Sequence, residues 1–381
     1  MKIGLVLERF DPARGGLEHW TWQFACALVR HGHEVHVVAF EFYIDAERDG
    51  IVVHRLERMP RSRVDRAALI AAQLPALRFD VVHDMGIGWS ADVIQPHAGS
   101  TIALWEHNLM RIPKWRQIRF WRERRYRELT EIERRQHASA ATIVPLSRML
   151  QRNFEELHRL PPERMRLIYN GVDVERFTPD ARERWRTATR AELGLRDDEV
   201  LFLMLAHNLL LKNAEAVIRA AAQLVAEGLP VRVVIGGGKT TSRFEKLADK
   251  LGVSRAVSFL GLVDSVPYYA AADVYVQPTW YDPCSLVTLE ASASGLPVIT
   301  SRFNGASELM SDGKEGFILD DPADLATLAA RMRELLDPDR RVAMGTGGRA
   351  MTMAHTLEHQ VTEFLQLYGE IVASRARLRS V

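Results

Sequence analysis

The sequence predicts an α/β protein with two doubly wound domains, each built on a parallel sheet. Three observations point to this class. The chain has 381 residues, which exceeds the size at which one hydrophobic core usually keeps growing. Short apolar runs alternate with segments of helical periodicity from the first residues onward. Each half of the chain has its own series of such alternations, and this alternation produces a parallel sheet flanked by helices.

The first series begins with a strand, a loop, a helix and a second strand. A loop containing proline and glycine precedes a helical pattern over residues 17–31, and Gly32 offers a C-cap for that helix. The strands expected in this series are residues 2–7, 34–40, 80–83 and 141–146.

The second series begins after Pro161 and Pro162. Its expected strands are residues 166–169, 200–206, 231–236, 257–260, 274–277 and 297–301. We therefore expect one Rossmann-like domain over residues 1–165 and another over residues 166–355. The segment 356–381 carries a last helical pattern, which we expect to pack back on the first domain. Two such units predict a cleft between the carboxyl ends of their strands.

Composition limits the classes of function. A formal net charge of +1 provides no global attraction to nucleic acid. Cys26 and Cys284 are far apart, which favours a reducing compartment over a disulfide framework. The sequence has no 18-residue apolar stretch free of charges and no signal-like segment at its start, so we expect a cytoplasmic location.

The segment 280–298 carries the most chemical information. A loop follows the expected strand 274–277, and a helix then begins near Ser285 and stops at Gly295. We expect the amides of Ser285, Leu286 and Val287 to be free at the positive end of the helix dipole. A diphosphate placed there would be stabilised without a metal ion.

Two carboxylates flank this helix start, Asp282 in the loop and Glu290 in the helix. A carboxylate can accept two hydrogen bonds from a ribose diol or from sugar hydroxyls. Spacing alone also fits a simpler interpretation, in which Asp282 caps the helix and Glu290 is a solvated surface residue.

This segment resembles the acidic-x7-acidic signature of the retaining GT-B glycosyltransferases called group 1. The residues shared with that signature are Leu286, Val287, Leu289, Glu290, Ala291, Gly295, Pro297 and Val298. Asp282 stands where a glutamate is usual, and Pro283, Cys284 and Ser285 stand where Gly-Phe-Gly is usual. The other matching motifs are Gly15-Gly16-x-Glu18, Asn170-Gly171-Val172-Asp173 followed by Phe177, Gly236-Gly237-Gly238, and Phe259-x-Gly261. Within this class the chain is most similar to lipopolysaccharide-core glucosyltransferases.

The resemblance implies a GT-B fold and transfer of a hexosyl unit from a nucleotide diphosphate sugar, with a UDP-sugar favoured. The acceptor would be a hydroxyl of a surface glycan or a lipid-linked glycan, and the anomeric configuration would be retained. The leaving phosphate would itself accept the acceptor's proton, so no protein base, cofactor or metal is expected. The donor would bind the domain 166–355 and the acceptor the domain 1–165.

The resemblance also assigns roles in the N-terminal half. It places Gly15 and Gly16 beside the donor phosphates, with Glu18 near the same cleft, and it brings His97 to the transferred sugar. It assigns Gly237 to donor binding. The residues alone leave a simpler interpretation open, namely a strand–helix turn at the two adjacent glycines and a structural histidine at position 97. The pair His83-Asp84 is a second-rank candidate.

Lys212 is the candidate cation for the leaving diphosphate, because a fixed ammonium offsets the charge that develops on the β-phosphate. The family uses an Arg/Lys pair, but His207, Asn208 or Leu210 occupies the place of the arginine here. Two alternatives therefore stay open: a weak or silent GT-B-fold protein that binds glycan or lipid, and a nucleotide-sugar epimerase.

Residues 111–127 hold eight cationic side chains, one acidic side chain and four aromatic residues. Such a segment suits an anionic membrane surface, and it equally suits a solvated arginine face over an aromatic core. No nucleic-acid-binding module accompanies it. The thirteen histidines are scattered, and the pair His355 and His359 lacks a nearby Glu or Cys set of zincin type, so no metal site is predicted.

Overall fold

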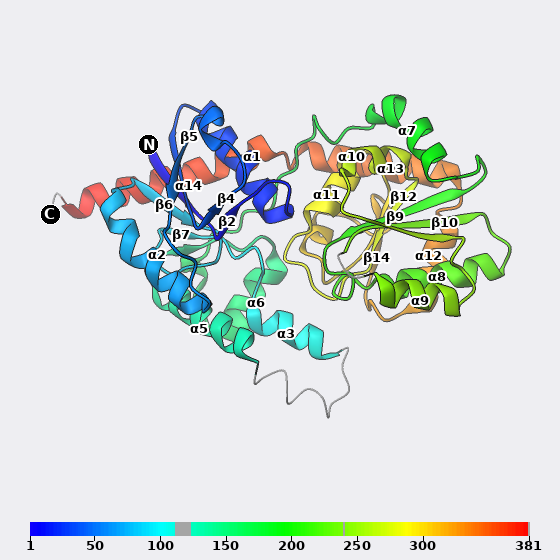
Figure 1. Ribbon diagram of the computed structural model, residues 1–381, viewed down its shortest axis with the longest axis horizontal. Helices are drawn as coiled ribbons and strands as arrows, with labels where there is room; N and C mark the ends of the chain where they lie inside the picture. Colours follow the sequence, from blue (N-terminus) through cyan, green and yellow to red (C-terminus); the bar gives the residue numbers. More distant parts are fainter. Residues whose placement is uncertain (111–122, 239–240, 380–381) are drawn as a thin grey trace. The chain divides into compact units, whose positions relative to one another are not determined.

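The structure is a computed structural model that describes residues 1–110, 123–238 and 241–379. It divides into two compact units (Figure 1). The first unit comprises Met1–Tyr169 and Glu358–Val381, and the second comprises Asn170–Leu357. Both junctions lie a few residues after the positions expected from the sequence.

The first unit contains a parallel six-stranded sheet in the order β5-β3-β1-β6-β7-β8. Its strands are β1 Lys2–Val6, β3 Glu34–Ala39, β5 Ile51–Arg55, β6 Val81–Asp84, β7 Val93–Ile94 and β8 Thr142–Ile143. A separate pair is formed by β2 Arg9–Phe10 and β4 Glu41–Phe42. The strand order reverses direction between β1 and β6, as it does in a doubly wound sheet.

The helices of this unit are α1 Gly16–Arg30, α2 Arg63–Leu77, α3 Thr101–Met110, α5 Arg124–Ala138, α6 Arg148–His158 and α14 Leu357–Arg379, with 3₁₀ turns at Ala46–Asp49 and Pro162–Arg164. Helix α14 packs on α1: the Trp20 indole donates to Gln360 Oε1 at 2.9 Å, and the rings of Phe24 and Phe364 lie 5.2 Å apart. The last helix therefore returns to the first unit, as the sequence predicts. Among the described helices, none has both the length and the apolar character needed to cross a bilayer.

The second unit repeats the same plan, with a parallel sheet in the order β11-β10-β9-β12-β13-β14. Its strands are β9 Val200–Ala206, β10 Val231–Gly237, β11 Val257–Gly261, β12 Val274–Gln277, β13 Val298–Ser301 and β14 Gly316–Leu319. Its helices are α7 Ala181–Glu192, α8 Ala214–Ala226, α9 Ser242–Lys250, α10 Ser265–Ala271, α11 Leu286–Ala293, α12 Leu325–Glu334 and α13 Pro338–Met353, with a 3₁₀ turn at Gly305–Leu309.

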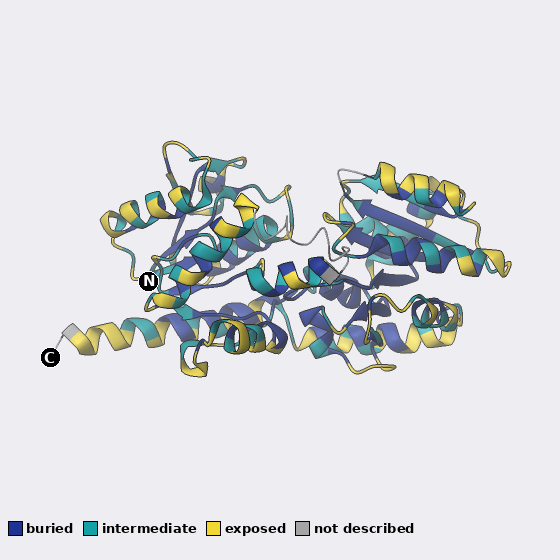
Figure 2. Ribbon diagram, turned by 90° about the horizontal axis from the view of Figure 1, so that it is seen from below, coloured by how far each residue is buried: buried dark blue, intermediate teal, exposed yellow. Residues whose placement is uncertain are grey.

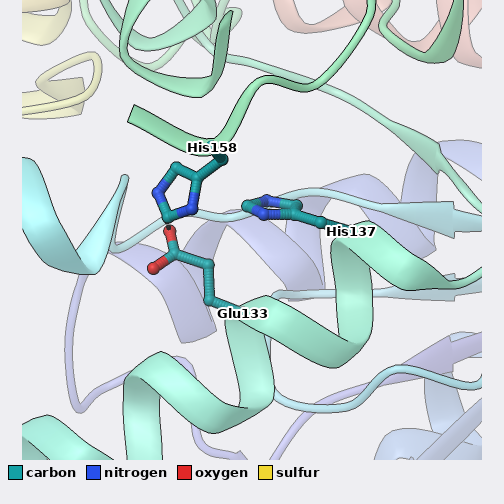
Figure 3. Close-up of side chains that lie close together, drawn as sticks. All are labelled: Glu133, His137 and His158. Carbon is teal, nitrogen blue, oxygen red and sulfur yellow. Dashed lines mark ion pairs between the residues drawn. The ribbon is translucent and has the colours of Figure 1, made fainter. Parts of the chain in front are cut away.

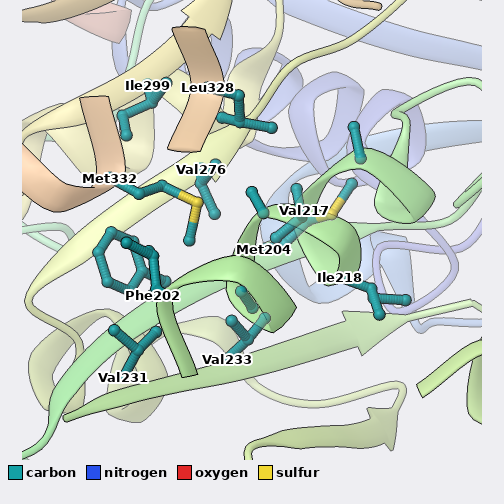
Figure 4. Packing of buried hydrophobic residues seen from close by; sticks show 14 of the residues in the cluster. Phe202, Met204, Val217, Ile218, Val231, Val233, Val276, Ile299, Leu328 and Met332 are labelled. Atoms are coloured by element: carbon teal, nitrogen blue, oxygen red, sulfur yellow. The ribbon is translucent and has the colours of Figure 1, made fainter. Parts of the chain in front are cut away.

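Apolar side chains on one face of this sheet pack under α8, α9 and α12. Figure 4 shows Phe202 and Met204 of β9 in the same cluster as Val217 of α8 and Met332 of α12. The intervening residues of β9 are equally buried on the opposite face, so the strand is one continuous apolar run. Figure 2 shows that exposed residues gather on the outer sides of the helices, while the strands are buried.

The prediction of a strand at residues 166–169 is wrong. Met165 makes only an isolated bridge to Ile143, and the Ile168 amide then donates to Pro145 O at 3.2 Å. The neighbouring strand β8 is two residues long at the edge of the sheet, so it has too few backbone partners to hold a further strand. This segment also belongs to the first unit rather than the second.

Candidate functional site

The carboxyl ends of β9 and β12 form the switch point of the second sheet, where doubly wound proteins bind ligands. Residues 207–213 follow β9, and residues 278–285 follow β12. Hydrogen bonds join the two loops, because Leu211 O accepts the Trp280 amide at 2.9 Å and the Thr279 hydroxyl at 3.2 Å. The two loops are therefore joined to each other at the carboxyl ends of β9 and β12.

Lys212 of the first loop and Asp282 of the second form an ion pair. Lys212 Nζ lies 2.6 Å from Asp282 Oδ2 and 3.2 Å from Tyr281 O, and both charged side chains are mostly buried. The Asp282 backbone is fixed on both sides, since its amide donates to Phe303 O and its carbonyl accepts from Gly305 N, both at 2.8 Å. An ammonium has three donors. The contacts to Asp282 and Tyr281 account for two of them.

The start of α11 differs from the prediction in one respect. Ser285 is the N-cap, but its amide donates to Asn304 Oδ1 at 3.1 Å, so the expectation that this amide is free is wrong. Its hydroxyl lies 2.9 Å from Gln277 Oε1. Leu286 and Val287 are the first two helical residues and are half-buried. Their N–H groups have no acceptor within the helix, so these two amides present the positive end of the dipole.

Buried Asn304 holds this helix start in place. Its Oδ1 accepts from the amides of Ser285 and Ala306, each at 3.1 Å. Its Nδ2 lies 3.0 Å from the hydroxyls of both Thr288 and Thr300. No spacing in the sequence marks Asn304 as part of the site, because its partners come from separate elements.

Asn170 supports the same loop. This buried side chain donates from Nδ2 to Cys284 O at 2.7 Å. Asn170 opens one of the motifs that carry the family resemblance, so the sequence did contain a signal for it. Neighbouring Gly171 lies against the chain ahead of α14, where an added Cβ would lie 2.5 Å from Thr356 O.

Glu290 is not a solvated helix residue. Its Oε2 accepts a hydrogen bond from the Tyr269 hydroxyl at 2.9 Å, and the same hydroxyl lies 3.1 Å from Val287 O. Burial raises the pKa of Glu290 to about 7, although the hydrogen bond from Tyr269 and the charge of Arg176 act in the opposite direction. The carboxyl is therefore poised between its two protonation states near neutral pH. Tyr269 is a site residue that the sequence analysis missed.

Gly237 has a structural reason to be glycine. Its φ is +107°, and an added Cβ would lie 2.5 Å from Ala206 O on the adjacent strand. Gly236 similarly leaves room for the Leu205 side chain. The glycines therefore let β10 run close to the end of β9, beside the loop that carries Lys212.

In the first unit, the loop after β1 leads into α1. Gly15 is the N-cap, in an extended conformation, and Gly16 is the first helical residue. Glu18 lies in the first turn, where a negative charge is favourable, and it pairs with Arg14 at 3.2 Å. The first turn of α1 therefore carries a carboxylate, Glu18, that is already paired with Arg14.

His97 follows β7 and packs against Trp20, with the ring centroids 4.7 Å apart and the ring planes tilted by 54°. Burial lowers the pKa of His97 to about 3, so the imidazole is neutral. Its Nε2 is buried and has no hydrogen-bond partner among the described residues. Buried polar atoms are normally paired, but the buried Nε2 of His83 also has no partner among the described residues, so this feature does not set His97 apart.

His83 and Asp84, the second-rank candidates, make hydrogen bonds that stabilise the fold. His83 Nδ1 lies 2.7 Å from the Tyr368 hydroxyl of α14, and burial lowers the pKa of His83 to about 3. Asp84 Oδ1 accepts the amides of Gly86, Ile87 and Gly88, and burial raises the Asp84 pKa to about 6.

The basic segment can be placed only in part, because residues 111–122 lie outside the described residues. Arg124, Arg125 and Arg127 begin α5 and are exposed. Arg124 forms an ion pair with Glu128 at 2.7 Å.

Two family profiles match the chain, one in each unit. The profile of the family described as Glycosyl transferases group 1 matches residues 186–351, and the profile described as Glycosyltransferase Family 4 matches residues 14–176. A D-inositol 3-phosphate glycosyltransferase of Corynebacterium urealyticum is 32% identical over 55% of this chain, which spans about half (51%) of that enzyme's length. An enzyme of the same name from Thermobifida fusca is 27% identical, over 93% of this chain and 88% of its own.

Solved structures show the same fold. WaaG, a glycosyltransferase involved in lipopolysaccharide biosynthesis, superposes with a TM-score of 0.81 at 22% identity, covering 96% of this chain and 99% of its own. Anabaena HepE in complex with UDP-glucose superposes with a TM-score of 0.72 at 20% identity, with coverages of 96% and 99%. Together the two profiles span most of the sequence, in the order of the two units. The chain therefore belongs to the group 1 glycosyltransferases and has the GT-B fold.

Proposed function

We propose that this glycosyltransferase moves a hexosyl unit from a UDP-sugar to a hydroxyl of a surface glycan or a lipid-linked glycan, with retention of configuration and without a metal ion. The similarity to HepE, whose structure contains UDP-glucose, favours that donor. The similarity to WaaG, which takes part in lipopolysaccharide biosynthesis, favours an envelope glycan as acceptor.

The donor half of the proposal rests on one observation above all, the ion pair of Lys212 and Asp282 at the ends of β9 and β12. The diphosphate would lie against the amides of Leu286 and Val287, with Lys212 completing its neutralisation. Glu290, oriented by Tyr269, would accept the ribose hydroxyls. Asp282 would accept from hydroxyls of the sugar.

In the proposed reaction the bond between C1 of the sugar and the β-phosphate oxygen breaks, and the acceptor oxygen bonds to C1 on the same face. The acceptor's proton passes to the leaving phosphate, so no protein base is required. Lys212 and the α11 dipole stabilise the charge that develops on this phosphate. Neutral His97 would contact the transferred sugar through a hydrogen bond rather than through charge.

A thermal-shift screen with UDP-, GDP-, ADP- and TDP-sugars tests the donor, since a bound donor raises Tm by mass action. NMR of the product then reports the anomeric configuration, and added chelator tests the need for a metal. A shift with UDP-sugars and a retained product would support the proposal. Stabilisation without turnover would favour a silent binding protein, and conversion of the donor sugar without an acceptor would favour an epimerase.

We further propose that the basic segment that ends with Arg124, Arg125 and Arg127 meets an anionic membrane surface. Each cation near such a surface contributes about 1 kcal/mol. Charge reversal at Arg119, Arg122 and Arg125 is expected to abolish co-sedimentation with vesicles containing phosphatidylglycerol. Vesicle binding that survives this change would overturn the membrane assignment.

A further inference from the structure

Three side chains capable of binding a metal ion converge in the first unit (Figure 3). Glu133 and His137 lie one turn apart on α5, and His158 is the last residue of α6. One ligand atom from each of the three lies within 4.8 Å of the others. The sequence analysis missed this cluster, although the spacing of Glu133 and His137 places both on one face of a helix.

We infer that Glu133, His137 and His158 bind a transition-metal ion of the Zn²⁺ class. Two ligand atoms of a tetrahedral zinc site lie about 3.4 Å apart, because each is about 2.0–2.1 Å from the ion. His158 Nε2 lies 3.4 Å from Glu133 Oε1, which matches this spacing. The remaining separations between the ligand atoms are also within 4.8 Å.

The ligand set selects the class of ion. Two imidazoles and one carboxylate suit zinc, copper and nickel, whereas magnesium and calcium prefer oxygen ligands alone. The His137 and His158 rings lie 4.5 Å apart, so the two imidazoles come from different helices to the same place. Imidazole is the commonest side-chain ligand for such ions.

The surroundings resemble the outer shell of a metal site. The Thr101 amide donates to both carboxylate oxygens of Glu133, at 3.1 and 3.2 Å, and so fixes the orientation of the carboxylate. Ser100 Oγ also lies near the cluster, 3.1 Å from His158 Nε2, and a water molecule would complete a four-coordinate site. Glu133 is 5% exposed, and burial of that kind strengthens the attraction between a carboxylate and a cation.

His137 makes ring contacts with His158 and Phe154 but no hydrogen bond to any described residue. A hydrogen-bonded structural role therefore accounts for Glu133 and His158 but not for His137. A bound ion accounts for all three. It would link α5 and α6 to the start of α3, which directly follows the loop that carries His97.

The site uses none of the residues proposed to bind the donor, so it can be tested separately from the proposed function. Full-length protein dialysed against EDTA and then against buffer would be titrated with ZnCl₂ by calorimetry, with Tm measured in parallel. We expect a single ion per chain at this site and a rise in Tm. His137→Gln is expected to weaken Zn²⁺ binding at least about ten-fold, and the Tm of the metal-free variant should stay near that of the wild type.

His359→Gln is the matched control, because His359 is an exposed histidine on α14; its affinity should equal that of the wild type. A second variant, His158→Gln, should also lose the visible spectrum of tetrahedral Co²⁺ formed by the wild-type protein. The inference is overturned if His137→Gln binds Zn²⁺ as tightly as His359→Gln, or if the wild type gains no thermal stability from ZnCl₂.

Discussion

Lys212 Nζ lies 2.6 Å from Asp282 Oδ2, and this ion pair joins the loop after β9 to the loop after β12. The cation proposed for the leaving phosphate and the carboxylate proposed for the sugar thus hold each other in position before a donor binds. Such preorganisation is the usual source of electrostatic catalysis, since the groups need not reorganise during the reaction.

Lys212→Met is expected to reduce kcat by roughly 10²–10³-fold, the usual effect of removing one fixed donor at a developing charge. The measurement is initial rate with saturating UDP-glucose and an envelope-glycan acceptor. Lys246→Met, on the exposed face of α9, is the matched control and should keep the wild-type rate. An unchanged kcat in Lys212→Met would remove the ammonium from the mechanism.

The protonation of Glu290 should make donor affinity depend on pH. Its pKa is raised to about 7, and only the carboxylate accepts hydrogen bonds with both oxygens. The Kd for UDP-glucose should therefore fall as the pH rises from about 6 to about 8, and Glu290→Gln should flatten the profile. Titration calorimetry across this range measures both; an equal slope in the two proteins would contradict the assignment.

The same shift has a consequence for stability, with the opposite sign. The folded protein holds the Glu290 proton up to about pH 7, whereas the ordinary pKa is 4.5. Between these values the folded state binds more protons than the unfolded state, so the contribution of Glu290 to the unfolding free energy falls as pH rises. Glu290→Gln should lose this dependence, as followed by Tm against pH.

Asn304→Ala should destabilise the second unit and weaken UDP binding together. Removal of this buried side chain leaves the Ser285 and Ala306 amides without their acceptor, at a cost of about 2 kcal/mol or more. Thr187→Ala, on the exposed face of α7, should shift the free energy of unfolding by less than about 1 kcal/mol. Urea denaturation compares the two variants, and equal effects would refute the role given to Asn304.

Gly237→Ala should be more destabilising than Gly313→Ala, although both residues have positive φ values. The added Cβ at position 237 meets the Ala206 backbone at 2.5 Å, whereas nothing lies within 4 Å at position 313. We expect a loss of about 1 kcal/mol at Gly313 and clearly more at Gly237. Similar Tm changes would show that backbone conformation alone, not close strand packing, requires glycine at 237.

The fold was largely predictable because its central strands are buried on both faces. The prediction for β9 and for β12 matches the structure at both ends, since each is an apolar run bounded by a loop. Edge strands carry a weaker signal: β5 mixes exposed and buried residues and was missed, and the false strand at 166–169 lies beside the short edge strand β8.

The sequence predicts which site residues follow which strands, but it does not predict which of these residues meet in the folded protein. The sequence places Lys212 and Asp282 in loops after two strands, but their contact depends on those strands being neighbours in the sheet. The hydrogen bond that the Ser285 amide donates to Asn304 Oδ1 joins residues 19 positions apart. The meeting of His158 with Glu133 likewise depends on the packing of helices, which no local spacing encodes.

The most direct test of the account is the affinity for UDP after removal of one backbone donor. Leu286 is the first residue of α11, where proline is well tolerated, and Ser285 before it has ψ of 113°, which suits a following proline. Leu286→Pro deletes the N–H group, and Leu286→Ala keeps it while shortening the side chain. Calorimetry should find UDP bound at least about ten-fold more weakly by Leu286→Pro than by Leu286→Ala, as expected for one charge-assisted hydrogen bond. Equal affinities in two well-folded variants would show that the amides at the start of α11 do not hold the diphosphate.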